Sequence, residues 1–335
     1  MIKEIGVIGA GAWGTTLANL VAEKWGRVHL WVYEEDLCDA MATKRENVIY
    51  LPGQKLHSSV IPPSSMEAAS RAKDLIVSAV PSQFVRDRIK EVSRHLKESA
   101  IVLSASKGIE TETLMLMSQV LQEVLPSYLH PRISVLSGPS FAREVAQRLP
   151  TAVAIASEDQ ETALALQQLL STPYFRVYTS KDMIGIQLGG ALKNIIAIAV
   201  GASDGIGLGH NTRAALITRG LAEITRLGIA LGADPLTFQG LSGVGDLVLT
   251  CTGDLSRNRT VGRMLGQGMK LEEILKDMKS VAEGITTTRS AYHLSQKLSV
   301  EMPITESVYT ILYEKEKIAS AVERLLKRRL TEELY

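Results

Sequence analysis

A lysine within an apolar segment is the first candidate for chemistry in this chain. Residues 189–200 read GGALKNIIAIAV, in which Lys193 and Asn194 are the polar exceptions. The segment has the composition of a buried helix, and the helical-wheel neighbours of Lys193 carry no charge. Burial would lower the pKa of this lysine, as a catalytic acid or base near neutral pH requires. The alternative is a lysine whose side chain extends along the protein to place its charge in water.

Two further polar segments follow in the second half of the chain. Residues 243–250 read GVGDLVLT and place Asp246 between glycines and an apolar run. This aspartate is either a site residue or simply a helix cap or turn residue. Residues 255–260 read LSRNRT, where Ser256 is expected to cap a helix whose first turn holds two arginines and an asparagine. Such a helix start favours phosphate or carboxylate binding, although a solvated helix face has the same composition.

The N-terminus has the pattern of a dinucleotide-binding turn. An apolar run is followed by Gly9, Gly11 and Gly14 in the order GAGAWG, and then by a helical pattern. The first glycine allows a tight turn, the second lets a pyrophosphate approach the backbone, and the third lets helix and strand pack closely. We therefore expect NAD or NADP to bind here, with the phosphates at the free N–H groups of the helix start.

An acidic pair suggests which of the two cofactors is preferred. Glu34 and Glu35 follow the second apolar run, VHLWV, about 20 residues beyond the glycines, where an acid would meet a ribose 2′-hydroxyl. One of them therefore favours NAD over NADP. Alternatively, both acids merely begin a solvated helix.

Loops after later strands are expected at the same edge of the sheet. Lys107 follows the run AIVLSAS, and residues 137–140, SGPS, lie at the end of the run RISVLSG. Because ligands bind at the carboxyl ends of parallel strands, Lys107 is placed where cofactor and substrate meet, unless it is an ordinary surface lysine. Ser140 is expected to cap a helix that begins FAREVAQ.

The elements that must position these residues form two contrasting halves. Apolar runs rich in Val and Ile alternate with helical patterns up to residue 180, which predicts a mainly parallel, Rossmann-type α/β sheet. The predicted strands are 4–9, 28–32, 74–80, 100–106, 132–138, 151–157 and 175–180. The later residues predict an all-α domain with helices at 181–203, 211–231, 234–241, 256–266, 271–279, 284–298, 304–315 and 316–329. We expect a dinucleotide-binding domain over 1–185 and a helical substrate domain over 186–335, closely packed around a cleft.

Composition narrows the class of protein. The chain has 335 residues, 45% of them hydrophobic and 22% charged, with a net charge of +1, as in globular proteins that bind neither nucleic acid nor membranes. Two cysteines, Cys38 and Cys251, form no disulfide framework, and we expect an intracellular, cytoplasmic protein. No apolar run is expected to span a bilayer. The spaced Cys and His groups of a zinc site are absent from the sequence, so we expect no metal.

Ten motifs, occurring in one order along essentially the whole chain, resemble the bacterial NAD(P)-dependent glycerol-3-phosphate dehydrogenase family. They are GAGAWGTTLA, ASKGIE, SGPSFA, QLGGALKNIIAIA, SDGIG, ALITRGLAE, GVGDLVLTCT, SRNR, LGQG and VAEG. The resemblance implies a Rossmann domain followed by a helical domain like that of 6-phosphogluconate dehydrogenases. It implies reversible hydride transfer between sn-glycerol 3-phosphate and dihydroxyacetone phosphate, which supplies glycerol 3-phosphate for glycerophospholipid synthesis.

The resemblance also implies roles for particular residues. Lys193 matches the catalytic acid/base, with Asn194 beside it, and Lys107 matches a lysine that contacts both cofactor and substrate. The other substrate positions are Gly138, Ser140, Asp246, Thr250, Ser256, Arg257 and Asn258. The cofactor positions are Gly9, Gly11, Ala12, Trp13, Gly14, Tyr33, Glu34, Lys107, Ala142, Arg257, Val281 and Glu283. Ala12 departs from the serine that relatives often carry there, so a hydroxyl contact to the pyrophosphate is lost while the backbone N–H remains.

Other functions remain compatible with the residues taken alone. A dehydrogenase of the same architecture that acts on a hydroxyacid or thioester would also use an arginine-rich helix start. A non-catalytic dinucleotide sensor would keep the fold without needing Lys193 and Lys107 together. The expected partner is a small-molecule substrate, and the apolar helical half favours a homodimer.

Overall fold

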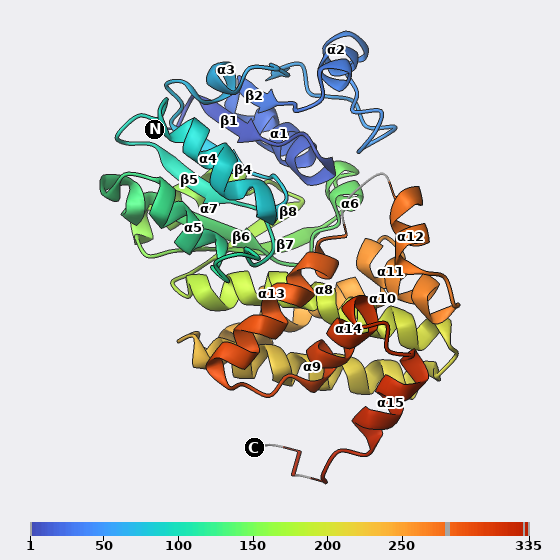
Figure 1. Cartoon of the computed structure of the whole chain (residues 1–335). Coiled ribbons are helices and arrows are strands. Elements are labelled where there is room, and N and C mark those ends of the chain that lie inside the picture. The colour runs from blue at the N-terminus through green and yellow to red at the C-terminus, as the bar shows by residue number, and fades with distance from the viewer. Residues whose placement is uncertain (1, 279–281, 331, 334–335) are drawn as a thin grey trace.

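The protein consists of a sheet-based half and a helical half that lie directly against each other (Figure 1). The computed structural model describes residues 2–278, 282–330 and 332–333. A mainly parallel sheet is built from the first 180 residues, and the long helix that follows it begins at Met183. This arrangement confirms the fold class expected from the sequence.

The sheet has eight strands in the order β3-β2-β1-β4-β5-β6-β7-β8. The strands are β1 (Ile5–Ile8), β2 (Val28–Trp31), β3 (Val60–Ile61), β4 (Leu75–Ser78), β5 (Ile101–Ser104), β6 (Ile133–Ser137), β7 (Thr151–Ser157) and β8 (Phe175–Ser180). All seven predicted strands form. The two-residue strand β3 at the sheet edge was missed, because so short a segment gives no periodic signal. Strand β7 runs antiparallel to β6, while the other neighbours are parallel.

Apolar side chains cover both faces of the sheet. In β1, Ile5 and Val7 join one buried cluster, while Ile8 joins the cluster on the opposite face. This two-sided burial explains why the strands appear in the sequence as continuous apolar runs. The covering helices are α1 (Ala12–Trp25), α2 (Glu35–Lys44), α3 (Met66–Ser70), α4 (Val85–Ser93), α5 (Met117–Val124), α6 (Ala142–Ala146) and α7 (Gln160–Leu170), with 3₁₀ turns η1 (Ser82–Phe84) and η2 (Ser127–Arg132).

The helical half is built around α8 (Met183–Gly205), whose two sides face the sheet half and α9 (Gly209–Ala230). Figure 1 shows α8 between these two neighbours, and the later helices follow in the same half. These are α10 (Asp246–Thr252), α11 (Arg257–Gly266), α12 (Leu271–Asp277), α13 (Glu283–Leu298), α14 (Pro303–Tyr313) and α15 (Ile318–Leu326). Most predicted helices form with shifted ends, and residue 279, the predicted end of one of them, lies outside the described residues.

One predicted helix is wrong in type. Residues 234–241 do not form an α-helix but a 3₁₀ turn, η3 (Pro235–Gln239), followed by a π-type turn, η4 (Leu241–Gly245). The backbone of Gly243 departs from helical geometry, and a Cβ atom there would lie 2.0 Å from the carbonyl oxygen of Phe238. The close approach of two backbones therefore overrides the local helical pattern.

The expectation that no apolar segment is long enough to span a bilayer is also wrong, because one helix reaches that length. Helix α8 has 23 residues and is long and apolar enough to cross a bilayer. However, 89% of its apolar window is buried inside the protein, where it forms the centre of the helical core. Its apolarity is thus explained by packing between the sheet half and the surrounding helices.

Candidate functional site

Two lysines share one buried carboxylate at the junction of the halves. The Nζ atom of Lys193 lies 2.5 Å from Oδ1 of Asp246, and Nζ of Lys107 lies 2.8 Å from its Oδ2. The three side chains are 9%, 16% and 1% exposed, respectively. Lys193 therefore does not extend into water, Lys107 is not a surface lysine, and Asp246 is more than a turn residue. With two cations and one anion, the cluster favours a substrate oxygen that gains negative charge.

The surroundings of Lys193 lower its proton affinity. Burial of the ammonium group, together with the charge of Lys107, lowers the pKa of Lys193 to about 8, while the carboxylate of Asp246 acts in the opposite direction. The sequence argument found no charge near Lys193 on its own helix. The partner comes instead from α10, which packs against α8. A lysine with this pKa can both donate and accept a proton near neutral pH.

Glycines on α8 permit this close packing. A Cβ atom at Gly189 would lie 2.2 Å from the carbonyl oxygen of Ser242, and one at Gly190 would lie 2.3 Å from Oγ of Ser137. Any larger residue would push α8 away from η4 on one side and from β6 on the other. The pair just before Lys193 therefore brings its helix close to both Asp246 and the sheet edge.

Lys107 is held by a loop that enters the helical half. Ile109 and Leu116, just beyond it, are fully or almost fully buried in the apolar core around α8. The Oγ atom of Ser290, on α13, donates a hydrogen bond to the carbonyl oxygen of Ile109 at 3.1 Å. Gly108 has a φ of +150°, a backbone conformation that glycine adopts without strain. Lys107 thus belongs to the sheet half in sequence but is anchored to the helices.

The SGPS loop completes one side of the cluster, although Ser140 does not have its predicted capping role. The carbonyl oxygen of Gly138 accepts hydrogen bonds from Lys107 Nζ at 3.3 Å and from Ser140 Oγ at 3.0 Å. Helix α6 begins at Ala142, with Phe141 in the N-cap position, so Ser140 lies too early to cap it. Its hydroxyl instead folds back on its own loop, as serine often does in turns.

Neighbouring polar groups extend the cluster along α8 and α10. Thr250 Oγ1 donates to the carbonyl oxygen of Asp246 at 2.7 Å and so stays within one turn of the carboxylate. Asn194 is 5% exposed and directly follows Lys193 on α8. The buried thiol of Cys251 has a pKa raised to about 12 because burial disfavours the thiolate, so it stays neutral near Lys193.

The SRNR segment forms the first turn of α11, as predicted, with Ser256 at its N-cap. The Oγ atom of Ser256 accepts from the backbone N–H of Arg259 at 3.2 Å, which leaves its O–H free to donate. The Oδ1 atom of Asn258 accepts from the N–H of Gly284 at 3.0 Å, which leaves its amide N–H groups free. The side chain of Arg257 is exposed. Three potential donors therefore remain at this helix start, which suits a phosphate group.

The glycine turn has the geometry that a dinucleotide requires. Gly9 has a φ of +110°, and a Cβ atom at Gly14 would lie 1.9 Å from the carbonyl oxygen of Gly9. A Cβ atom at Gly11 would meet no atom within 4 Å, so that side of the turn is open. Helix α1 has no side-chain cap at its start, and the buried Nε1 of Trp13 has no hydrogen-bond partner in the described structure. These residues fit a bound pyrophosphate at the start of α1.

The other cofactor positions are spread around this end of the sheet. Glu34 directly precedes α2 and its Oε1 accepts from the hydroxyl of Tyr50 at 2.6 Å. Tyr33 is 72% exposed, and the carbonyl oxygen of Ala142 accepts from Thr16 Oγ1 of α1 at 3.1 Å. Burial raises the pKa of Glu283 at the start of α13. Val281 lies outside the described residues.

Sequence reasoning missed Asp204, which binds Arg259 through both nitrogens of one edge of its guanidinium at 3.1 and 2.9 Å. Asp204 stands in the motif SDGIG, but nothing in its sequence neighbourhood indicates a partner 55 residues away. The described residues contain no group of three or more His, Cys, Asp or Glu placed to hold a metal ion.

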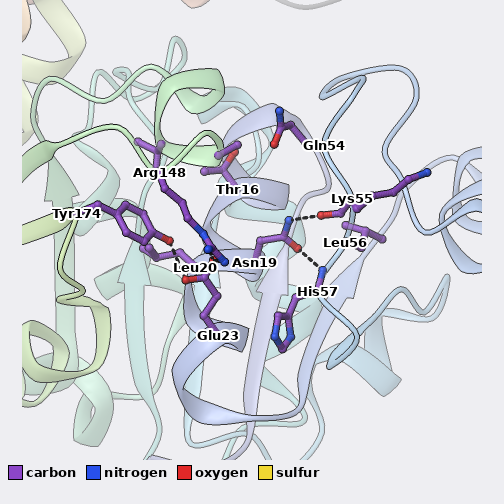
Figure 2. A pocket seen from close by; sticks show the side chains of 12 residues that line it. Thr16, Asn19, Leu20, Glu23, Gln54, Lys55, Leu56, His57, Arg148 and Tyr174 are labelled. Carbon is purple, nitrogen blue, oxygen red and sulfur yellow. Dashed lines mark hydrogen bonds and ion pairs between the residues drawn. The ribbon is translucent and has the colours of Figure 1, made fainter.

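A separate hollow of about 350 Å³ lies on the sheet half between α1, residues 54–57 and α6 (Figure 2). Its polar side chains bond mainly to one another: Glu23 pairs with Arg148 at 3.0 Å and accepts from the hydroxyl of Tyr174 at 3.0 Å. None of the predicted site residues lines it. The hollow is therefore separate from the lysine–aspartate cluster.

Comparisons with known proteins cover both halves of the chain. Residues 4–163 and 182–323 match the family models described as the N-terminus and C-terminus of NAD-dependent glycerol-3-phosphate dehydrogenase. The chain is 57% identical over 328 residues to glycerol-3-phosphate dehydrogenase [NAD(P)+] of Geobacter metallireducens, covering 98% of both chains. It is 55% identical to the enzyme of that name from Geobacter sulfurreducens, covering all of both chains.

Among solved structures, a glycerol-3-phosphate dehydrogenase of Coxiella burnetii superposes on this fold with a TM-score of 0.93 at 39% identity. The alignment covers 98% of this chain and 99% of that chain. The likeness therefore extends over both halves and the junction that holds the cluster.

Proposed function

Because the chain belongs to the NAD-dependent glycerol-3-phosphate dehydrogenase family, we propose that it interconverts sn-glycerol 3-phosphate and dihydroxyacetone phosphate with NAD(H) or NADP(H). The observation that carries this proposal is the pairing of Lys193 and Lys107 on one carboxylate, Asp246, between the two halves. A ketone reductase needs a proton donor of suitable pKa there, and the cluster supplies one.

We assign the cofactor to the turn formed by Gly9, Gly11 and Gly14, with the phosphates at the start of α1. The bound nicotinamide supplies or accepts the hydride. Trp13, Tyr33, Glu34, Ala142 and Glu283 are proposed to line the same cofactor path, with Ala12 contributing only its backbone N–H. The protein's task at this end is to hold and orient the reactive ring.

We assign the proton transfer to Lys193. As the ketone carbon of dihydroxyacetone phosphate accepts a hydride, its oxygen gains negative charge, and the ammonium of Lys193 donates a proton to that oxygen to form the hydroxyl. In the reverse direction the neutral amine takes the hydroxyl proton. Lys107 contributes a second positive charge beside the same oxygen, and Asp246 orients both ammonium groups. Gly138, Ser140, Asn194 and Thr250 complete the proposed substrate surroundings.

We assign the phosphate of the substrate to Ser256, Arg257 and Asn258 at the start of α11. Their free O–H, guanidinium and amide N–H groups donate hydrogen bonds, and the helix start favours an anion. Holding the far end of the substrate makes hydride transfer effectively a reaction within one complex. Arg257 is also proposed to reach the cofactor.

Further features rest on family membership and remain proposals. They are a cytoplasmic location, a homodimer, the supply of glycerol 3-phosphate for glycerophospholipid synthesis, and the division into domains at residues 1–185 and 186–335. Buried in the helical core, α8 is not proposed to insert into a membrane.

The direct test is the absorbance of the reduced nicotinamide after the purified protein is mixed with NADH and dihydroxyacetone phosphate. The proposal expects rapid loss of absorbance that depends on the phosphorylated ketone. In a parallel reaction, a 2-ketoacid takes the place of dihydroxyacetone phosphate. Faster turnover of the 2-ketoacid would indicate a hydroxyacid dehydrogenase. NADH binding without turnover of either substrate would indicate a dinucleotide sensor.

A further inference from the structure

Asp204, near the end of α8, binds two arginines at once. Its Oδ1 accepts from Nε and Nη2 of Arg213 at 3.1 and 2.7 Å, and its Oδ2 accepts from Nε and Nη2 of Arg259 at 3.1 and 2.9 Å. The side chain of Asp204 is only 10% exposed. Each carboxylate oxygen thus receives one guanidinium edge, which is a strong and directional arrangement of charge-assisted hydrogen bonds.

A third nitrogen of Arg259 is also bound. Its Nη1 donates to the carbonyl oxygen of Thr252 at 3.3 Å and to Oδ1 of Asp254 at 3.0 Å. Its backbone N–H donates to Oγ of Ser256, the cap of α11. This single arginine therefore joins the end of α8, the segment after α10, and the first turn of α11.

Close backbone packing fixes α11 on α8 in the same region. A Cβ atom at Gly262 would lie 2.0 Å from the carbonyl oxygen of Ile198, and one at Gly201 would lie 2.1 Å from that of Arg259. Two helices in backbone contact cannot slide past each other without a clash. The arginine anchor and the glycine contacts therefore act on the same turn, the one that begins with Ser256.

The two arginines of SRNR differ in what is left for a ligand. The side chain of Arg259 is 14% exposed and paired with two carboxylates, whereas Arg257 is exposed and forms no ion pair within the described residues. Because Nε, Nη1 and one N–H of Nη2 of Arg259 are already bound, holding a phosphate through two of its donors would break existing bonds.

We propose that Asp204 and Arg259 are positioning residues that hold the first turn of α11 in place for the substrate phosphate, with Arg257 as the ligand. This inference rests on the proposed function. Arg259 contributes through the position of its neighbours and does not contact the phosphate. Asp204 neutralises the charge of the Arg259 guanidinium and fixes its orientation.

The test compares Asp204→Asn and Arg259→Lys with the wild-type protein in steady-state reduction of dihydroxyacetone phosphate. Both variants lose a charge-assisted pair, so we expect the KM for this substrate to rise about tenfold or more. Inorganic phosphate, tested as a competitive inhibitor, should lose affinity by a similar factor. The kcat should stay close to wild type, because neither residue touches the reacting atoms. The KM for NADH should rise far less than the KM for dihydroxyacetone phosphate, because only Arg257 in this turn is proposed to reach the cofactor.

Arg213→Lys is the matched control, because it removes an equivalent pair of guanidinium donors from the same carboxylate without altering α11. It should leave the KM and the inhibition by phosphate unchanged. An equal rise in this control, or unchanged KM in the Arg259→Lys variant, would overturn the proposal. So would a parallel loss of kcat and NADH affinity, which indicates general disruption.

Failure of the wild-type protein to reduce dihydroxyacetone phosphate would instead contradict the proposed function. Phosphate affinity is then measured by direct titration, with protection against thermal unfolding as the readout. If Asp204→Asn does not fold, the charge-conserving Arg259→Lys variant alone decides the outcome.

Discussion

The Nζ atom of Lys193 lies 2.5 Å from Oδ1 of Asp246, although 53 positions separate the two residues in the sequence. Lys107, from the other half of the chain, occupies the second oxygen of the same carboxylate at 2.8 Å. Because the carboxylate is almost completely buried, neither ammonium group is fully solvated, and each depends on the same anion. Two ammonium groups therefore share one carboxylate, and one of them belongs to a lysine that can lose its proton near neutral pH.

Replacing Lys193 tests its assignment as the acid and base. In Lys193→Met we expect kcat to fall by about 10²-fold or more, the usual contribution of a positioned proton donor. NADH should still bind, because the glycine turn lies in the sheet half. The unfolding temperature should change little, since a costly buried charge is removed while Asp246 keeps its pairing with Lys107. Lys297→Met, at an exposed position on α13, is the control. Near-normal turnover by folded, NADH-binding Lys193→Met would remove Lys193 from the mechanism.

The pH dependence should report the lowered pKa of Lys193. Reduction requires the ammonium form, so its rate should be steady below pH 8 and fall above the pKa of about 8. Oxidation requires the neutral amine, so its rate should rise through the same range. Steady-state kcat/KM measured in both directions gives the two profiles. A limb that persists unchanged in Lys193→Met would belong to another group.

Asp246→Asn should move that pH dependence in a defined direction. The carboxylate of Asp246 favours the ammonium form of Lys193, so its removal lowers the pKa of Lys193 below about 8. The fall in reduction should therefore begin at lower pH, and kcat should also decrease because both lysines lose their orienting partner. An unshifted profile would show that Asp246 does not influence the titrating group.

Arg257→Lys should weaken binding of the substrate phosphate. Lysine keeps the charge but lacks the planar pair of donors, so the KM for dihydroxyacetone phosphate should rise. Because Arg257 is exposed, the melting temperature should stay near wild type. Calorimetric unfolding and steady-state kinetics measure the two quantities. If the KM does not change, the phosphate lies elsewhere than at this arginine.

Cofactor preference should depend on Glu34. We expect the wild-type protein to use NADH at least as well as NADPH, because a carboxylate near the ribose repels a 2′-phosphate. Glu34→Gln should improve kcat/KM for NADPH relative to NADH, while Tyr50→Phe, which removes only the hydroxyl bound to Glu34, serves as the comparison. A strong NADPH preference in the wild-type protein would show that the acid points away from the ribose.

The order of elements was accessible from the sequence because it depends on local patterns. Valine- and isoleucine-rich runs gave seven strands, since strands buried on both faces need apolar side chains at every position. The glycines at 9, 11 and 14 indicated the cofactor turn because the contact of Gly14 with the backbone of Gly9 tolerates no larger residue. Ser256 indicated the start of α11 because helix caps are local.

Contacts between distant segments were decided only by the tertiary structure. The sequence suggested an unusual lysine at 193 and an aspartate at 246, and their direct bond depends on glycines that let α8 approach η4. The sequence pattern also failed at Ser140, whose hydroxyl bonds to Gly138 in its own loop and caps no helix, and at Pro235–Gln239, which forms a 3₁₀ turn. Likewise, nothing near Asp204 in the sequence distinguishes Arg259 from Arg257. Helix packing alone buries the first arginine against a carboxylate and leaves the second exposed.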